Sequence, residues 1–255
     1  MSRQNSTTAH WLPANGAIAR AEADPALAHV LNAPPDPTRP YVYLGTCCHI
    51  NKFGILNPAA LEKVIRCTTG LRSELLRVHP IAGNFDLKHL CALHRFLFQD
   101  VYEWAGEIRI IDFQRNKLPY TSAAEATEAI AQLPADLPPP RQFAKAAEIE
   151  SECESLFDDL RRELFLRDLH RDDFVLRGAN YLTRLFIIHP FRDGNGRSIR
   201  AFFKLLAARA GWDLELDSIP QGRRHISAWR AHGGDVSDFL EVFAQCVRGR
   251  LNTTS

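Results

Sequence analysis

The sequence predicts an all-α domain that carries one small β-hairpin, and three observations support this fold class. Apolar residues recur at helical spacing in segments at about 58–79, 86–104, 122–132, 141–167, 172–188, 196–210, 219–230 and 234–250. The β-rich run from Ile108 to Phe113 is followed by polar residues and a second extended run from Leu118 to Thr121, which is typical of a hairpin. The 255 residues, 45% of them hydrophobic, are enough to bury one core.

The helix boundaries and buried faces follow from local chemistry. Asp86 is expected to cap the second helix, because its side-chain oxygen can accept from the unpaired first-turn amides. Pro190 should end one helix and Gly211 another. The expected apolar faces of the first two helices are Leu61, Val64, Leu71, Leu75 and Leu76, and then Leu90, Leu93, Phe96, Leu97 and Val101.

The composition divides the chain into an arm and a domain. Residues 1–39 are polar, then rich in alanine, then rich in proline, which indicates a flexible N-terminal arm with at most one short helix near 17–31. From residue 40 the composition is globular, and the domain is expected to extend over residues 40–250.

Charge and cysteine content narrow the function classes. The net charge is +1, from 31 basic and 30 acidic side chains, so nothing in the balance calls for direct contact with nucleic acid or an anionic membrane. No apolar run is long enough to span a bilayer, and the N-terminus lacks a secretory pattern. Six cysteines without a CxxC pair indicate reduced thiols, and therefore a cytoplasmic protein.

The segment 189–200, His-Pro-Phe-Arg-Asp-Gly-Asn-Gly-Arg-Ser-Ile-Arg, concentrates polar chemistry at the start of a helix. Gly194 and Gly196 permit positive φ angles and leave backbone amides uncovered. A helix N-terminus favours phosphate, because unpaired amides and the positive end of the helix dipole meet there. Arg197 and Arg200 are three residues apart and therefore share one helix face, where two guanidinium groups suit a di- or triphosphate.

Three further residues of this segment complete a reaction site. Asp193 can hold Mg²⁺ against phosphates. His189 can take a proton from a hydroxyl group near neutral pH, and Asn195 can donate its amide to a phosphate oxygen. A base, a metal carboxylate and an anion site are what phosphoryl or nucleotidyl transfer requires. The Gly-Lys-Ser/Thr sequence of a P-loop nucleotidase is absent, which excludes that class.

The same twelve residues resemble the Fic family pattern His-Pro-Phe-x-Asp/Glu-Gly-Asn-Gly-Arg-x-x-Arg at all nine specified positions. The segments 40–45, 51–55 and 93–109 also resemble the family, so the resemblance covers about residues 40–248. It implies a Fic fold and Mg²⁺-dependent transfer of AMP from ATP to a protein hydroxyl group.

The resemblance also implies a role for each residue of the motif. His189 would deprotonate the target side chain, and Asp193 would coordinate Mg²⁺. Gly194, Asn195 and Gly196 would surround the α- and β-phosphates, Arg197 and Arg200 would hold the departing phosphates, and Phe191 would anchor the loop in the core. The hairpin would be the family's flap, with Ile111 and Lys117 near the bound target protein.

Regulation can also be addressed from the family pattern. Many members contain an inhibitory Ser/Thr-x-x-x-Glu-Gly/Asn helix, whose glutamate occupies the second arginine of the motif. Neither Thr121 to Glu125 nor Ser237 to Glu241 completes this pattern. The resemblance therefore implies a separate small antitoxin, a topoisomerase subunit as a possible target, and an Arg200 side chain without a partner in this chain.

Other interpretations remain beside these predictions. The same loop can serve transfer of UMP or phosphocholine, removal of AMP, or a degenerate protein-binding module, although the intact His189 and Asp193 argue against the last. Outside the motif the structural interpretation is favoured. Arg109 and Glu103 are expected to be surface or ion-pair groups, and Tyr102 and Trp104 packing residues. His94 is expected to be a partly buried histidine with satisfied hydrogen bonds, and Lys117 is as well explained as a solvated turn residue.

Overall fold

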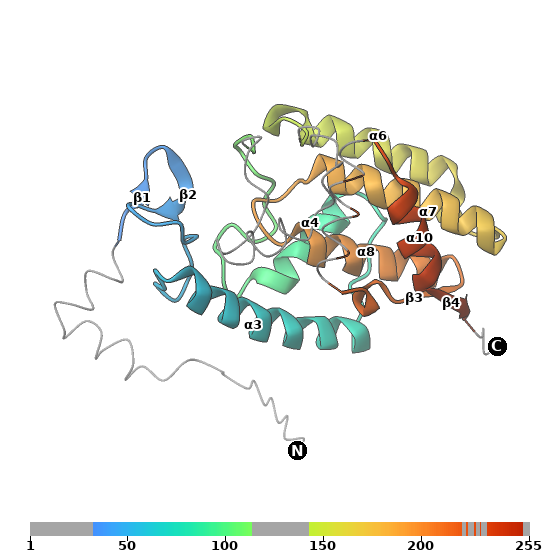
Figure 1. The fold of residues 1–255 in the computed structure, drawn as a ribbon, viewed down its shortest axis with the longest axis horizontal. Helices are drawn as coiled ribbons and strands as arrows, with labels where there is room; N and C mark the ends of the chain where they lie inside the picture. Colours follow the sequence, from blue (N-terminus) through green and yellow to red (C-terminus); the bar gives the residue numbers. More distant parts are fainter. Residues whose placement is uncertain are drawn as a thin grey trace, which may run out of the picture. The chain divides into compact units, whose positions relative to one another are not determined.

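The computed structural model of the protein describes residues 33–113, 143–220, 223, 227, 230 and 234–251. These residues form two compact units, one ending at Leu61 and the other beginning at Glu62 (Figure 1). The predicted arm up to residue 32, the second hairpin arm at 118–121 and the predicted helix at 122–132 lie outside the described residues, as does most of the predicted helix at 219–230.

The first unit is built around a small antiparallel hairpin. Strand β1 (Pro35–Asp36) pairs with strand β2 (Arg39–Tyr43), and the Asp36 carboxylate closes the turn by accepting from the backbone N–H and the hydroxyl of Thr38. The side chain of Asn51 then organises the following turn, since its amide donates to the carbonyl of Ile55 and its oxygen accepts from the Ile55 N–H.

The second unit is helical. Its helices are α4 (Leu87–Phe98), α6 (Ile149–Arg162), α7 (Arg171–Ile188), α8 (Asn195–Arg209) and α10 (Ser237–Cys246), and α3 (Pro58–Val78) enters it from the first unit. The short elements are the 3-10 turns η1 (Ala146–Glu148), η2 (Leu164–Leu166) and η3 (Leu216–Ser218), and the strands β3 (Trp212–Leu214) and β4 (Val247–Arg250). The predicted all-α class is therefore confirmed, but neither two-stranded sheet, β1–β2 or β3–β4, is the hairpin predicted at 108–121, and the described residues 108–113 of that segment form no strand.

The core of the second unit lies around α7 and α8. Helix α7 packs against α6, α8 and α10, and α8 packs against α4 and β3 (Figure 1). A glycine permits one of these close approaches, because a Cβ on Gly178 of α7 would lie 2.5 Å from the Phe243 ring of α10. Phe202 and Phe203 of α8 are at most 2% exposed. The two helices that flank the 189–194 loop are thus fixed by close packing.

The predicted start of α4 and the predicted end of α8 are confirmed, but α4 ends at Phe98 rather than at Trp104, and the helix predicted at 234–250 ends at Cys246, directly before β4. The predicted apolar face of α3 is also partly wrong. Asp86 caps α4 by accepting from the His89 N–H at 2.8 Å, and Gly211 follows α8 with a φ of 83°. On α3, Leu71 and Leu75 are 71% and 49% exposed, whereas Ile65 is 2% exposed. This helix carries apolar residues on two sides, and spacing alone could not decide which side meets the core.

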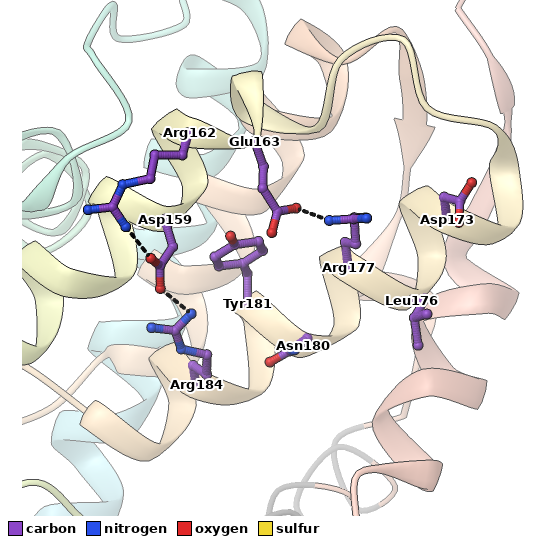
Figure 2. Close-up of a pocket in the computed structure, with 9 residues that line it drawn as sticks. All are labelled: Asp159, Arg162, Glu163, Asp173, Leu176, Arg177, Asn180, Tyr181 and Arg184. Carbon is purple, nitrogen blue, oxygen red and sulfur yellow. Dashed lines mark hydrogen bonds and ion pairs between the residues drawn. The ribbon is translucent and has the colours of Figure 1, made fainter.

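A surface pocket is lined by α6, α7 and the residue after α6, and of its three ion pairs one lies within α6 and two reach α7 (Figure 2). Asp159 pairs with Arg162 at 2.8 Å and with Arg184 at 3.0 Å, while Glu163 pairs with Arg177 at 2.8 Å. Because each arginine of the pocket has an acidic partner, we interpret the pocket as part of the contact that holds α6 and α7 together, not as a binding site.

All six cysteines are free, as predicted, and burial raises the pKa of the Cys153 thiol to about 12. Among the residues that the structure describes, none of the helices is both long enough and apolar enough to cross a bilayer.

Candidate functional site

The loop between α7 and α8 begins and ends in left-handed backbone conformations. His189 caps the C-terminus of α7 with a φ of 51°, which is uncommon for a residue other than glycine. Gly194 has a φ of 77° and stands directly before α8, and a Cβ there would lie 2.3 Å from the Phe98 ring. The sequence therefore needs glycine at 194 both for the turn and for the approach to Phe98.

Asn195 holds the loop closed. Its side-chain oxygen accepts from the Phe191 N–H at 2.9 Å, and its side-chain amide donates to the Phe191 carbonyl at 2.7 Å. Phe191 itself is fully buried, so its predicted anchoring role is confirmed. The side-chain oxygen and one of the two amide hydrogens bind backbone within the loop, so the predicted contact of Asn195 with phosphate would use the second amide hydrogen and stays a prediction.

His94 of α4 holds the loop through a hydrogen bond to Asp193 and a ring contact with Phe191. The N–H of Gly106 donates to Nδ1 of His94 at 2.8 Å, so the ring proton lies on Nε2, which donates to the Asp193 carbonyl at 3.0 Å. The ring stacks on Phe191 with centroids 3.9 Å apart. Burial lowers the pKa of His94 to about 4, which keeps the ring neutral. The satisfied histidine that was predicted is confirmed, with burial complete rather than partial.

The Asp193 carboxylate is oriented by neighbours on both sides. Oδ1 accepts from the Gly194 N–H at 2.7 Å and lies 3.9 Å from Nη2 of Arg197, while Oδ2 accepts from the Tyr102 hydroxyl at 2.9 Å. Burial, followed by the neighbouring charge of Asp193, raises the pKa of Tyr102, so the hydroxyl stays a donor. Tyr102 was predicted only to pack, and this contact adds a polar role that spacing in the sequence could not reveal.

Arg197 and Arg200 both lie on α8 near the loop, as predicted. The guanidinium group of Arg197 stacks over the Phe98 ring, 4.8 Å from its centroid, and Nη1 is 3.4 Å from the Thr69 hydroxyl. Arg200 is not without a partner, which corrects the prediction: its Nε donates to Oδ1 of Asp217 at 2.5 Å. Asp217 lies in η3, seventeen residues further along the chain, which is beyond the reach of helix-spacing arguments.

Arg109 is buried, which corrects the prediction that it is a surface or ion-pair group. Its side chain is 1% exposed, and Nε donates to the His189 carbonyl at 2.9 Å. Nη1 donates to the Ile111 carbonyl at 2.8 Å, and Nη2 donates to the carbonyls of Ala144 and Ile188. A positive charge at these carbonyls stabilises the C-terminal end of α7. Arg109 therefore connects the start of the predicted flap to His189, the residue predicted to accept the proton.

The His189 ring is also held in place. Its Nδ1 lies 3.2 Å from the Phe186 carbonyl, which places the ring proton on Nδ1 and the lone pair on Nε2. Phe113 meets the ring edge-on at 5.3 Å, and Phe143 packs against it at 4.3 Å. Residues 108–113 follow an irregular path without strand pairing, with Ile110 72% exposed, while Lys117 lies outside the described residues.

Asp193 fits a magnesium ion that is bound together with a nucleotide. Within the described ranges, no group of three or more His, Cys, Asp or Glu side chains could hold a metal ion alone. Mg²⁺ does not need such a group, because one or two carboxylates, substrate phosphates and waters complete its shell. The Asp193 side chain retains 16% exposure beside the N-terminus of α8, so a hydrated ion can approach it.

Comparison with known proteins agrees with this arrangement. A profile of the Fic/DOC family matches residues 84–207. The chain is 30% identical over 213 residues to the probable protein adenylyltransferase Fic of Salmonella typhimurium, which covers 82% of the chain and 92% of that relative. The chain therefore belongs to the Fic/DOC family, as the motif predicted.

Two further matches extend the comparison. The protein adenylyltransferase VbhT of Bartonella schoenbuchensis is 34% identical over 203 residues, which are 80% of this chain but 37% of that relative. The BepC protein of Bartonella tribocorum, solved with bound AMPPNP, superposes with a TM-score of 0.69 at 26% identity and covers 82% of this chain and 97% of that one. The predicted enzyme class agrees with the names of both curated relatives.

Proposed function

We propose that this chain transfers AMP from ATP to a hydroxyl side chain of a target protein, with Mg²⁺ bound at Asp193. The observation that carries the proposal is the α7–loop–α8 segment, in which a held histidine, an oriented carboxylate and two arginines surround one helix N-terminus. The adenylyltransferase names of the relatives and the AMPPNP bound to the BepC structure support the same donor class.

In the proposed reaction, His189 acts as the general base through Nε2. The hydrogen bond from Nδ1 to Phe186 fixes this tautomer, and Arg109 holds the His189 backbone. The target oxygen attacks the α-phosphorus as its proton passes to Nε2, and the bond between that phosphorus and the pyrophosphate oxygen breaks. The proton is taken up by His189 and pyrophosphate leaves with the electrons of the broken bond, so the reaction requires no further co-reactant.

The charge that develops on the phosphates is met by α8. Helix α8 begins at Asn195, so the backbone amides of Asn195 and Gly196 lie in its first turn, where the helix dipole favours anions, while the N–H of the N-cap Gly194 already donates to Asp193. Arg197 and Arg200 neutralise the departing pyrophosphate. Asp193 would hold Mg²⁺, which would supply additional positive charge at the phosphates.

We further propose that residues 40–250 are the catalytic domain, that residues 1–39 form an arm outside it, and that the enzyme acts in the cytoplasm. The target protein docks beside the 108–121 segment, where Ile110 is 72% exposed. A toxin role with a separate antitoxin, and a topoisomerase subunit as target, extend the proposal. Transfer of UMP or phosphocholine and removal of AMP are the enzymatic alternatives, because the loop residues do not select the donor.

The proposal is tested by incubating the chain with Mg²⁺ and cell lysate in parallel reactions that contain ATP labelled on the α- or the γ-phosphate. We expect protein to gain label from α-labelled ATP only, and His189→Ala to lose the transfer. His79→Ala removes an exposed histidine and is the matched control. Label from the γ-phosphate would indicate phosphorylation instead, and preferential labelling by α-labelled UTP would favour the UMP alternative. Equal transfer by His189→Ala would overturn the assigned base.

A further inference from the structure

One carboxylate reaches the second arginine of the motif from outside the loop. Nε of Arg200 donates to Oδ1 of Asp217 at 2.5 Å, with side-chain exposures of 15% and 62%. A Cβ built on Gly196 would lie 3.2 Å from Nη1 of the same guanidinium group. Arg200 is therefore close both to the first turn of α8, where phosphate is proposed to bind, and to an acidic side chain.

Asp217 belongs to a well-anchored segment. The buried side chains of Leu214 and Leu216 fix β3 and η3 to the core, and the Glu215 N–H donates to the Cys246 carbonyl at 3.0 Å. One helical turn after Arg200, Lys204 pairs with Glu215 at 3.0 Å. Two neighbouring ion pairs therefore connect one face of α8 to the β3–η3 segment.

We infer that Asp217 is a specificity-determining residue, which weakens the binding of a nucleoside triphosphate relative to a diphosphate by competing for Arg200. The inference rests on the proposed function, in which Arg200 holds the outer phosphates of ATP. Carboxylate and phosphate bind the same guanidinium donors. Because Nε is already bound to Asp217, a terminal phosphate gains the full set of donors only when this carboxylate is displaced.

The competition is expected to be modest and reversible. Asp217 is more than half exposed, and ion pairs near solvent are weak enough for a polyphosphate to replace them. After transfer, Asp217 can recover Arg200 and so favour release of pyrophosphate. Of the two incomplete inhibitory patterns, the one at Thr121 to Glu125 lies outside the described residues, and Glu241 of the other pairs with Arg223 at 2.9 Å.

The test measures the dissociation constants of AMPPNP and ADP by calorimetry, with Mg²⁺ at fixed ionic strength. The proteins are the full chain, Asp217→Asn, Arg200→Ala and the double variant. Glu215→Gln, which breaks the neighbouring pair with Lys204, is the matched control. We expect Asp217→Asn to tighten AMPPNP binding about three- to fivefold. ADP binding should change less than about twofold, and Glu215→Gln should leave both constants unchanged.

The Arg200→Ala background decides whether the effect passes through this arginine. There, Asp217→Asn should no longer change AMPPNP binding. Weaker AMPPNP binding by Asp217→Asn, an equal gain for ADP, or a gain that persists without Arg200 would each overturn the inference while leaving the proposed function intact. Failure of the full chain and every variant to bind AMPPNP would instead reject the proposed function and the inference together.

Discussion

The hydroxyl group of Tyr102 donates to Oδ2 of Asp193 at 2.9 Å and so connects two residues that are 91 positions apart. Tyr102 is 1% exposed and stacks on Trp104 with ring centroids 4.0 Å apart, which fixes the direction of the hydroxyl group. Groups that bind a metal-ligating carboxylate from behind set its orientation and its affinity for the ion. Tyr102 is thus a positioning residue for the proposed metal site.

Replacement of Tyr102 by phenylalanine should therefore weaken metal binding while the fold is retained. We expect the Mg²⁺ concentration needed for AMPPNP binding to rise about 10- to 100-fold. The lost hydrogen bond should lower the free energy of unfolding by about 1–3 kcal/mol. Calorimetric titration of Mg²⁺ measures the first effect and urea unfolding the second. Tyr181→Phe, which removes a tyrosine bonded to Glu163, should leave Mg²⁺ binding unchanged. Unaltered Mg²⁺ binding by Tyr102→Phe would reject the positioning role.

Two glycine substitutions with opposite effects test the geometry of the loop. Gly194→Ala places a side chain at a φ of 77° and 2.3 Å from the Phe98 ring, so it should lower the free energy of unfolding by about 2–4 kcal/mol. Gly70→Ala, inside α3 with nothing within 4 Å, should raise it by about 0.5–1 kcal/mol. Urea unfolding of both variants provides the comparison. A neutral Gly194→Ala substitution would mean that the turn is not required.

The conformation of the 189–194 loop could be predicted from the sequence, because it depends on residues within the loop and the first turns of α8. Pro190 follows the end of α7, Gly194 supplies the left-handed turn, and Arg197 and Arg200 share one face of α8 through helical spacing alone. Asp86 was likewise identified as a cap from its position before an apolar periodic segment, and the structure confirms it.

The partners of the loop could not be predicted, because they come from distant segments. Arg109 is a charged residue in an irregular stretch, for which sequence favours the surface, and Asp217 lies in the short turn η3, which no helical spacing connects to α8. Only the packing of the chain brings Arg109 to the His189 carbonyl, 80 positions away. The face of α3 was uncertain for a related reason, since Ile65 and Leu71 are equally apolar in a pattern but only one is buried.

The buried guanidinium group of Arg109 should be important for both stability and turnover. Arg109→Met leaves carbonyls of Ile188 and His189 without their donor, so we expect a loss of about 3 kcal/mol or more of unfolding free energy. Arg109→Lys should be intermediate in unfolding free energy, because a single ammonium group cannot reproduce the planar fork. Arg77→Met, which removes an arginine 62% exposed and paired with Glu74, should change stability by less than about 0.5 kcal/mol. Equal losses for Arg109→Met and Arg77→Met would contradict the buried network.

The neutral ring of His94 predicts that acid destabilises the protein. Its pKa is about 4 in the folded chain, against 6.5 for the ordinary group, because burial opposes the charged form. Between these two pH values the unfolded chain binds a proton at this ring and the folded chain does not. The free energy of unfolding therefore falls as pH decreases from about 6.5 toward 4, by roughly 3 kcal/mol for this group.

This contribution is isolated by comparing the full chain with His94→Gln, which has no titrating ring. Other groups, including His89, whose pKa burial also lowers, remain in both proteins and cancel in the difference. Urea unfolding at pH 7 and at pH 4 should show that the full chain loses roughly 3 kcal/mol more than the variant. Protonation at Nδ1 would also eliminate the acceptor for the Gly106 N–H, so the NMR signal of that amide should shift over the same acid range. Parallel stability curves for the two proteins would show that His94 is not held neutral in the folded chain.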